Sequence, residues 1–470
     1  MTQFKSMRLI KGLRFGIICI LIHISQTCAA QTLNLYDAVN RTITNYPLLQ
    51  ERQAEVAAGK AHINTVEGDR LPSLKLHDQV NVGTANSEVG SFFPMGVVVP
   101  TAGAIRPENV STAASGNIAL SLLEWQFYTF GFYNAEKKQA EASLAVNQAR
   151  YNSDKYLLTE NIVSLYLDWL KKYRLLQIEN ENLSREKAVL DAITANVRSG
   201  LKPGVDSSTA NAEYARNYIT YLQVQNAYST DQIAIANYTA TDTAQVKPDT
   251  SIFAGNTLQR LLDVQPSDSI TLAHPLLDYY QKQYELQLAN NKATGKKYLP
   301  RVSLEGAAWM RGSSISPQDV YSSNLADGLT YSRYNYLAGL AVTYNLFDLK
   351  RRHDELVEGR YNAMALKNEL QTQQIDLTKL SQQANMSYTN TVQRLNALPV
   401  QLRSAQQAYQ QQVALYKAGL NTLIDVTNAL YVLKQTETDM VLTQDDLLQL
   451  LYMRAGLSNQ LDLFLQHFKQ

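Results

Sequence analysis

The side chains that could perform acid–base, metal or nucleophilic chemistry are few and widely scattered along the 470-residue chain. After the first thirty residues the histidines are His62, His77, His274, His353 and His467. No two of them have the spacing of metal ligands on one helix or loop. The sequence also lacks a phosphate-binding loop, a dinucleotide fingerprint and the Gly-x-Ser-x-Gly turn of many hydrolases. We therefore expect a protein that is not an enzyme and that uses no cofactor and no bound metal.

Some titratable groups form local clusters, for which we favour structural interpretations. His274 directly precedes a proline, and we interpret it as a helix-start residue rather than as a ligand. The neighbouring Asp445 and Asp446 fall within a helical pattern, as do Glu355 and Glu358. We expect these four carboxylates to lie on solvated helix faces.

Two aspartates stand out because each follows a glycine that ends a long segment with a helical pattern. Asp206 comes shortly after Gly200, and Asp425 comes shortly after Gly419. A basic residue precedes each glycine, as is typical of a helix C-terminus that ends in a left-handed glycine cap. Acidic and hydroxyl side chains cap the free N–H groups of a new helix. We therefore expect Asp206 and Asp425 to mark the starts of returning helices.

These turns belong to a plan that occurs twice in the chain. Two marks recur 228 residues apart and a third recurs after 219: residues 45–49 as 273–277, 71–76 as 299–304, and 199–201 as 418–420. The nine-residue change in offset must fall between Pro72 and Gly200. Short motifs that recur in the same order at matched spacing predict two halves with the same structure.

Each half opens with a helical segment that is bounded by two prolines. The spacing is 25 residues in both cases, from Pro47 to Pro72 and from Pro275 to Pro300. A proline is tolerated in the first turn of a helix, whereas a later proline ends it. Such a helix would be roughly 35 Å long.

A strand hairpin with a long loop follows in each half. Apolar and polar residues alternate after Pro72 and again over 118–122, and in the second half over 302–310 and 336–344. A small soluble sheet would explain this pattern, but the outward tyrosines of the last strand and the leader described below also fit a membrane barrel. Four strands cannot close a barrel, and an open edge is not tolerated in lipid. Membrane-spanning strands would therefore require an oligomer.

The longest regular elements come next. Residues 131–198 contain no proline, and apolar residues recur every seventh position at Ile162, Trp169, Leu176, Leu183, Leu190 and Val197. This spacing predicts a coiled-coil helix about 100 Å long. The positions 219 residues later form a less apolar seam: Ser381, Tyr388, Leu395, Leu402, Tyr409 and Tyr416. Pro399 interrupts this second rod and predicts a kink that is confined to one half.

Residues 1–30 are predicted to be a secretory signal peptide. Four basic residues precede the apolar run 15–24, which is too short to span a bilayer, and small residues follow at 28–30. Both cysteines, Cys19 and Cys28, lie in this leader, so the rest of the chain has no thiol. The alternative is a lipoprotein signal acylated at Cys28, but residues 25–27 lack the usual leucine and small pair.

The composition after the leader excludes two classes of protein. It contains 39 basic and 42 acidic residues, a net charge of −3, which does not suit a nucleic-acid partner. No run of eighteen apolar residues occurs, so no transmembrane helix is expected.

Together these features resemble the TolC-like outer-membrane channels of tripartite efflux and type I secretion systems. The resemblance is carried by the Pro-Leu-Leu starts, the Leu-Pro entries to the strands, Asn345-Leu346-Phe347-Asp348, and the two glycine turns with their aspartates. It implies a mainly α fold with transmembrane β: a duplicated, coiled-coil α-barrel of long helices plus four β-strands per chain in a trimeric 12-stranded β-barrel.

The resemblance also implies how the chain is divided. We expect a signal peptide at 1–30, a first repeat of helix, β-hairpin and long helical hairpin at 31–240, and an inter-repeat equatorial region at 241–270. A second repeat would occupy 271–455 and a C-terminal tail 456–470. The inter-repeat region and the tail would form a girdle around the middle of the barrel.

As a function, the resemblance implies a passive, homotrimeric exit duct in the outer membrane of a Gram-negative bacterium, extending through the periplasm. The expected partners are a periplasmic adaptor, an inner-membrane pump reached through it, and outer-membrane lipid, with no nucleic acid. The sequence does not identify the cargo, which could be a drug, a metal ion or a polypeptide. A non-channel periplasmic coiled-coil scaffold or adhesin is the alternative, and an exported enzyme is a second rival.

Site residues transfer from the family only position by position. The resemblance implies a pore gate at Asp425 and Asn428. It also implies gate ties, residues whose polar bonds hold the helix pairs of the closed entrance together, at Asp206, Tyr416 and Asn421. The tips that dock to the adaptor would be at Gly200, Leu201, Gly419 and Leu420. Two positions depart from the family pattern. Asn428 is not acidic, which puts a second charged ring in doubt, and Asn421 is not the arginine of a charged tie.

Overall fold

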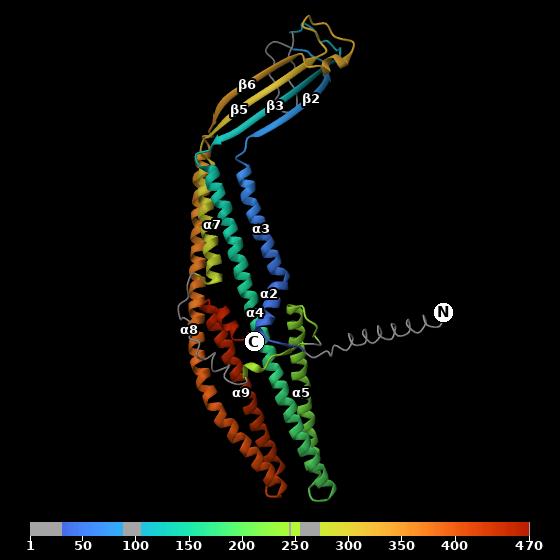
Figure 1. The fold of residues 1–470 in the computed structure, drawn as a ribbon, viewed down its shortest axis with the longest axis vertical. Coiled ribbons are helices and arrows are strands. Elements are labelled where there is room, and N and C mark those ends of the chain that lie inside the picture. Colours follow the sequence, from blue (N-terminus) through green and yellow to red (C-terminus); the bar gives the residue numbers. More distant parts are fainter. Residues whose placement is uncertain (1–30, 88–104, 244–245, 254–272, 470) are drawn as a thin grey trace, which may run out of the picture. The chain divides into compact units, whose positions relative to one another are not determined.

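The computed structural model describes residues 31–87, 105–243, 246–253 and 273–469. The predicted signal peptide and most of the predicted inter-repeat region lie outside the described residues. The described chain forms two compact units, a helical unit (31–54, 149–281 and 369–469) and a sheet unit (55–148 and 282–368). Both halves of the sequence contribute to each unit (Figure 1).

The sheet unit contains the two predicted hairpins. Its strands are β2 (Ser73–Gly83), β3 (Ala114–Tyr128), β5 (Arg301–Ser313) and β6 (Arg333–Thr343). They lie in the order β2-β3-β5-β6, and every neighbouring pair is antiparallel. The pairing of β3 with β5 therefore joins the hairpin of one half to that of the other. In the described single chain, β2 and β6 are edges whose outer backbone groups have no partner strand.

The strand register can be followed across the whole sheet along one row of residues. Leu76 lies opposite Ser121, Ser121 opposite Ala308, and Ala308 opposite Tyr336. Residues directly opposite each other share a face of an antiparallel sheet. The edge members of this row, Leu76 and Tyr336, are 80% and 87% exposed. The outward tyrosine predicted from the sequence is confirmed as exposed.

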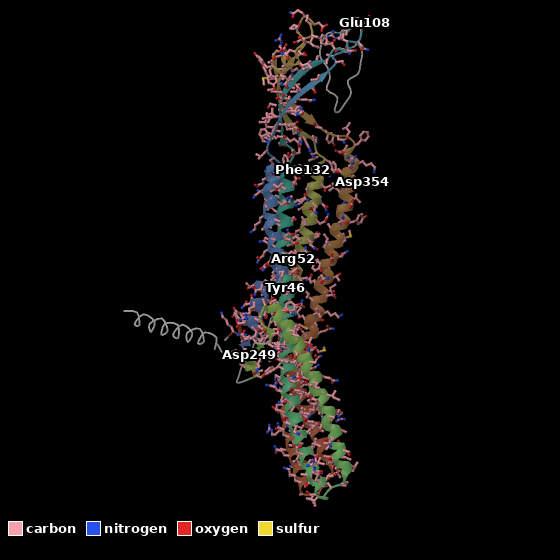
Figure 2. The ribbon with its side chains drawn as sticks, turned by 90° about the vertical axis from the view of Figure 1, so that its right-hand side faces the viewer. Tyr46, Arg52, Glu108, Phe132, Asp249 and Asp354 are labelled. Atoms are coloured by element: carbon pink, nitrogen blue, oxygen red, sulfur yellow. The ribbon has the colours of Figure 1, made fainter. Side chains whose placement is uncertain are left out.

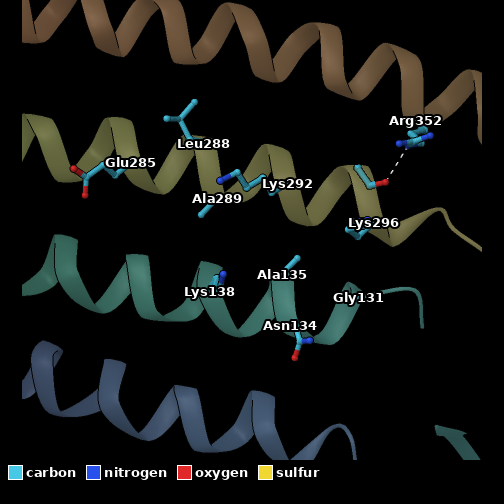
Figure 3. A pocket seen from close by; sticks show the side chains of 11 residues that line it. Gly131, Asn134, Ala135, Lys138, Glu285, Leu288, Ala289, Lys292, Lys296 and Arg352 are labelled. Atoms are coloured by element: carbon cyan, nitrogen blue, oxygen red, sulfur yellow. Dashed lines mark hydrogen bonds between the residues drawn. The ribbon is translucent and has the colours of Figure 1, made fainter. Parts of the chain in front are cut away.

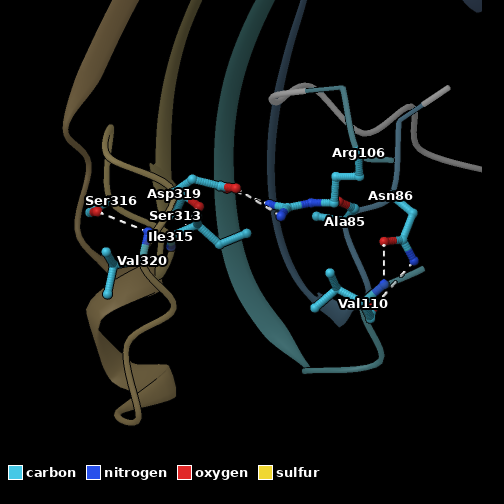
Figure 4. A network of polar contacts seen from close by, with 9 residues as sticks. All are labelled: Ala85, Asn86, Arg106, Val110, Ser313, Ile315, Ser316, Asp319 and Val320. Carbon is cyan, nitrogen blue, oxygen red and sulfur yellow. Dashed lines mark hydrogen bonds and ion pairs between the residues drawn. The ribbon is translucent and has the colours of Figure 1, made fainter. Parts of the chain in front are cut away.

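The loops of the two hairpins are linked by a polar network (Figure 4). The guanidinium of Arg106, in the first loop, pairs with the carboxylate of Asp319 in the second. It also lies over the ring of Tyr321, 5.2 Å from the centroid. Within the first loop, Asn86 and Val110 exchange hydrogen bonds of 3.2 and 3.0 Å. The network ties loops of both halves together at this end of the sheet.

Four long helices contribute residues to both units. These are α3 (Pro47–Gly68), α4 (Phe132–Arg198), α7 (Pro275–Lys297) and α8 (Asp348–Lys417). Within the sheet unit Arg70 Nη2, just beyond α3, donates to Asn134 Oδ1 on α4 across 2.8 Å. Between α7 and α8, the hydroxyl of Tyr298 donates to Glu355 Oε1 across 2.5 Å. Glu355 is partly exposed, as predicted for a solvated helix face, and it also bonds to Tyr298, the residue that follows α7.

The helical unit adds α2 (Leu35–Asn45), α5 (Gly204–Thr239), α9 (Leu423–Leu457) and α10 (Leu461–Gln466). A short strand β1 (Gln31–Leu33) pairs in parallel with β4 (Val246–Pro248), which precedes the 3₁₀ turn η2 (Ser251–Phe253). The sequence did not predict this pair. In the described ranges, no helix is both long and apolar enough to cross a membrane.

A large core joins the elements of the helical unit. Trp169 of α4 packs with Tyr228 of α5, and Leu447 of α9 and Leu35 of α2 are fully buried in the same cluster. Phe464 of α10 completes it. Burial of this much apolar surface is the main source of stability for such an assembly of helices.

An ion pair and a stacked pair of aromatic rings hold the junction of α2 and α3 to the same bundle. Arg52 Nε donates to Asp154 Oδ2 of α4 across 2.6 Å, and the ring of Tyr46 stacks on Tyr238 of α5 with 5.3 Å between centroids. Tyr46 and Arg52 are labelled in Figure 2. The chain therefore enters α3 at a fixed position against α4 and α5.

The predicted heptad seam is confirmed. Ile162 and Trp169 are fully buried in the large core, and Val197 and Tyr416 pack in a second cluster near the helix ends. Pro399 lies inside α8, which continues to Lys417, so the proline does not end the helix.

The structure corrects the interpretation of Asp445 and confirms that of His274. Asp445 is only 6% exposed, and its carboxylate pairs with Lys171 Nζ at 3.2 Å, so the prediction of a solvated face is wrong. The reason is that α9 packs this position against α4, which supplies the compensating cation. His274 is fully buried, and its Nδ1 accepts a hydrogen bond from the backbone N–H of Leu276 across 3.3 Å, as expected of a helix-start residue.

Candidate functional site

The two turns that join the long helices have the same backbone structure. Gly200 N–H donates to Val197 O and Leu201 N–H donates to Asn196 O, across 3.0 and 2.9 Å. Gly419 and Leu420 make the equivalent bonds to the last turn of α8. This pair of bonds is the Schellman motif.

Both turn glycines have positive φ, 72° at Gly200 and 75° at Gly419, which confirms the predicted left-handed caps. A Cβ at either position would meet no atom within 4 Å. The requirement for glycine therefore lies in the backbone conformation and not in a shortage of space.

The helices that return from the two turns begin differently. α5 begins at Gly204 after Pro203, and no side chain caps it. Asp206 lies in its first turn, so the expectation that Asp206 caps the helix is wrong; proline, which has no N–H to satisfy, occupies that place. α9 begins after Thr422, whose hydroxyl and backbone N–H both bond to Asp425 in a capping box. Asp425 thus supports a cap, as expected.

An apolar cluster holds the two helical hairpins together near these turns. Its buried members are Ile193 of α4, Ala210 of α5, Tyr416 of α8, and Leu423 and Val426 of α9. All four long helices of the helical unit contribute to it, so the tips form one packed body rather than two separate hairpins.

Tyr416, on the second hairpin, lies close to two charged side chains of the first hairpin, Lys202 and Asp206. The Lys202 ammonium lies 5.0 Å from the centroid of the Tyr416 ring. Burial, and then the negative charge of Asp206, raise the pKa of the Tyr416 hydroxyl. That hydroxyl is buried and makes no hydrogen bond to any residue that the structure describes. Two predicted tie residues, Asp206 and Tyr416, are therefore close enough to interact, and Lys202 joins them.

The third predicted tie residue makes a local contact instead. Asn421 Nδ2 donates to Gln412 Oε1 and to the Gln412 backbone oxygen, across 2.6 and 3.1 Å. Both residues belong to the α8–α9 hairpin. Within the described chain, Asn421 Oδ1 is buried without a partner, which leaves one acceptor available.

The two predicted gate residues lie on an exposed face of α9. Asp425 and Asn428 are three positions apart and both are exposed, whereas Leu423, Val426 and Leu430 face the core. Hydrogen bonds from the Thr422 hydroxyl and backbone lower the pKa of Asp425 below its usual value, so the carboxylate is charged at neutral pH. Ile424 and Tyr431 extend the same exposed surface.

Further from the tips, ion pairs that the sequence analysis missed link α4 to α9. Arg185 pairs with Glu437, and Lys434 Nζ lies 2.8 Å from Glu179 Oε2. Lys434 also donates to Asn217 Oδ1 of α5 across 3.4 Å. These partners are more than 200 positions apart, and no local spacing predicts such a contact. No group of three or more metal-ligating side chains comes together in the described part of the chain.

Two sequence comparisons bear on this arrangement. A family model described as "Outer membrane efflux protein" matches residues 38–241 and 269–451, and thus both halves. No curated protein matches the chain at a significant level of sequence similarity.

Solved structures of outer-membrane channels have the same fold. CusC superposes with a TM-score of 0.72 at 15% identity and 92% coverage of both chains. VceC from Vibrio cholerae gives 0.70 at 14% identity, covering 91% of this chain and 95% of its own. CmeC from Campylobacter jejuni gives 0.72 at 12% identity, covering 91% and 86%. At these identities the likeness shows the fold alone.

Proposed function

The chain belongs to the outer membrane efflux protein family, and from that premise we propose that three copies assemble into one continuous duct through the outer membrane and periplasm. The protein is an outer-membrane efflux channel, and its family does not favour the alternative of a periplasmic scaffold or adhesin. Members of the family are channels and not enzymes. The finer proposals concern the assembly, the gate and the partners.

The sheet of the single chain carries the proposal of a trimer. Its four strands leave β2 and β6 as open edges, and unpaired backbone groups in lipid cost several kcal/mol each. Three copies that pair β6 of one chain with β2 of the next would give a closed barrel of twelve strands. The helices α4 and α8, of 67 and 70 residues, would then form the wall of a tube roughly 100 Å long.

The duct is proposed to be passive. The sequence contains no nucleotide-binding loop, so energy would come from an inner-membrane pump that reaches this protein through a periplasmic adaptor. The two tips offer the adaptor a surface, because Leu201 and Leu420 are 72% and 74% exposed beside their glycines. Exposed apolar side chains at two similar turns suit a partner that contacts both hairpins.

A constriction at the tips is proposed to act as the gate. The exposed face of α9 that carries Asp425 and Asn428 points away from the tip core, which favours an orientation toward the axis of a trimer. Three Asp425 carboxylates at a narrow opening would make a ring of about −3 that attracts cations. Asn428 would add a polar but uncharged ring.

Opening is proposed to be a change in how the two hairpins pack. Asp206, Tyr416 and Asn421 would be the ties. Within the described chain, the Tyr416 hydroxyl and Asn421 Oδ1 have no hydrogen-bond partner and are free to bond to a neighbouring copy. A packed interface with two alternative arrangements responds to a partner as a switch. The adaptor complex would favour the open arrangement.

Detergent extraction of the outer membrane tests the assembly. We expect heat-modifiable trimers on electrophoresis and discrete conductance steps in planar bilayers. A monomer that is recovered from the soluble periplasmic fraction, with no conductance after reconstitution, would overturn the proposal.

A further inference from the structure

A groove with a volume of about 600 Å³ lies across α4, α7 and α8 in the sheet unit (Figure 3). Its basic side chains come from all three helices: Lys138 from α4, Lys292 and Lys296 from α7, and Arg352 from α8. Between them, apolar side chains such as Leu288 form the floor. We name this surface the basic groove.

The cations of the basic groove are not neutralised by the chain itself. Within the described ranges, Lys138, Lys292 and Lys296 form no ion pair. Arg352 Nε donates to the backbone oxygen of Gly295 across 3.0 Å, which fixes the guanidinium but leaves its charge uncompensated. The acidic side chain in the lining, Glu285, lies 2.9 Å from Lys282 outside the groove. The groove therefore has a net positive charge.

The same helices have the opposite character on their other face. There a smaller pocket of about 340 Å³ is lined by Glu136 of α4 and Asp69, which follows α3. Burial, and then the nearby Asp69, raise the pKa of Glu136. On α4, Lys138 and Glu136 point to different faces because helical positions two apart diverge by about 200°. The basic groove and this acidic pocket therefore lie on different faces of α4.

The basic groove also lies close to the strands. Gly131, in its lining, follows the end of β3 at Tyr128 by three residues, and Lys296 precedes β5 by five. Lys296 is therefore roughly 10 Å from β5, and Lys292 and Lys138, nine and ten residues from the nearest strand ends, lie about one further helical turn away. In an outer-membrane channel whose strands cross the bilayer, this is the level of the periplasmic headgroups.

We propose that the basic groove binds the phosphate headgroup of an anionic phospholipid in the periplasmic leaflet of the outer membrane. Lys138, Lys292 and Lys296 would contact the phosphate as point charges, with Arg352 held beside them. The inference depends on the outer-membrane location and not on the gate.

The layer of helices favours a lipid over a second copy of this chain as the occupant. Figure 3 shows the helices of this layer in the order α3, α4, α7, α8, so α3 and α8 are the outer helices. The groove is centred on α7, away from the β2 and β6 edges at which another chain would join.

The test uses the full-length protein in a neutral detergent and a soluble anionic lipid, dihexanoylphosphatidylglycerol. The variant K138Q/K292Q/K296Q removes three charges from the groove. Its control, K60Q/K367Q/K379Q, removes three charges from exposed helical positions outside it. At about fivefold per basic residue, the groove variant should bind up to a hundredfold more weakly, and the control should bind like the parent protein.

Two further arms identify the source of the phosphate. Dihexanoylphosphatidylcholine, which carries no net charge, should bind at least about tenfold more weakly than the anionic lipid. Inorganic phosphate at the same concentration should fail to displace the bound lipid. Equal binding of both lipids, displacement by inorganic phosphate, or full affinity in the groove variant would overturn the proposal.

Controls for folding keep the result interpretable. The groove variant should retain oligomer mobility and single-channel conductance, since the groove is remote in sequence from the tips. If the triple variant does not assemble, K138Q and K292Q are measured singly, and each should lose about fivefold in affinity. Normal conductance with unchanged lipid affinity would refute the lipid site and leave the channel proposal intact.

Discussion

Arg185 and Glu437 form a bidentate ion pair that links the two halves of the chain, with Nη1 donating to Oε2 and Nη2 to Oε1, each across 2.9 Å. Arg185 lies on α4 and Glu437 on α9, so the pair crosses from one helical hairpin to the other. Their side chains are only 24% and 13% exposed. The planar guanidinium matches the carboxylate in a way that a lysine cannot. Any movement that separates the hairpins must break this contact.

Arg185→Ala is expected to loosen the hairpins. It leaves the largely buried Glu437 carboxylate without its partner, a loss of order 1–3 kcal/mol. Thermal unfolding in detergent should shift to lower temperature, and single-channel conductance should rise or fluctuate more. Arg216→Ala is the control, because Arg216 pairs within its own helix with Glu213 at an exposed position, where ion pairs contribute little. Equal effects of the two substitutions would assign no special role to the pair with Glu437.

Asp425→Ala is expected to raise conductance and to weaken block by trivalent cations, because it removes the proposed ring of carboxylates. Its pKa is lowered by the bonds from Thr422, so block should persist in mildly acidic solution and be lost only as the pH falls through that lowered value.

Thr422→Ala separates the charge of Asp425 from its capping role. This variant loses the capping hydroxyl but keeps the carboxylate, so it should retain cation block even if the start of α9 is less stable. Asp425→Ala with unchanged conductance and unchanged block would remove Asp425 from the pore.

Asp445→Asn is expected to change how stability depends on pH. Burial is the largest influence on Asp445 and outweighs the attraction of Lys171, so the pKa of the Asp445 carboxyl group rises from its usual 3.8 to about 6. An acid whose pKa is raised on folding binds more protons in the folded state, so its contribution becomes less favourable as the pH rises from about 4 to 6.

The asparagine variant should therefore melt a few degrees higher than the parent protein at pH 7.5, and this difference should vanish near pH 4. Lys171 keeps an acidic neighbour in the variant, because it also pairs with Asp168. The exposed Asp446 provides the control, since its charge is the smallest of the influences on the pKa of Asp445 and Asp446→Asn should change the pH profile far less. A lower melting temperature for Asp445→Asn at pH 7.5 would mean that the ion pair outweighs the cost of burial.

Leu201→Gln combined with Leu420→Gln tests the proposed docking surface. Both leucines are exposed beyond a Schellman turn, so the change should leave assembly and conductance intact. Copurification with the periplasmic adaptor should fall by about tenfold or more, since apolar contacts at both tips are lost. Val432→Gln, at an exposed apolar position further along α9, should have no such effect. Retained adaptor binding in the double variant would place the docking surface elsewhere.

Local sequence patterns predicted much of the fold because they report on local backbone structure. The glycines at 200 and 419 predicted left-handed caps, and both have positive φ. The heptad spacing around Trp169 identified the buried seam, and alternation identified the strands that form the sheet. Helix ends, strand pleats and buried stripes depend on residues a few positions apart, so the order of residues along the chain is enough to predict them.

Only part of the candidate site could be predicted from the sequence. Resemblance placed Asp206, Tyr416 and Asn421 near the turns, and the structure brings the first two close together, but their roles as ties remain proposals, as do those of Asp425 and Asn428. The contribution of Lys202 was not predicted, because its contact with the Tyr416 ring crosses from one hairpin to the other.

Tertiary structure alone decided which distant side chains meet. The sequence by itself determined two similar halves, their helix lengths and their turns, because these follow from local propensity and spacing. It could not show that Asp445 is buried against Lys171, or that Arg185 meets Glu437 from 252 positions away. Such contacts depend on which helix faces pack together, and that choice is made by the whole core, where burial of large apolar surfaces outweighs the preferences of any single charged residue.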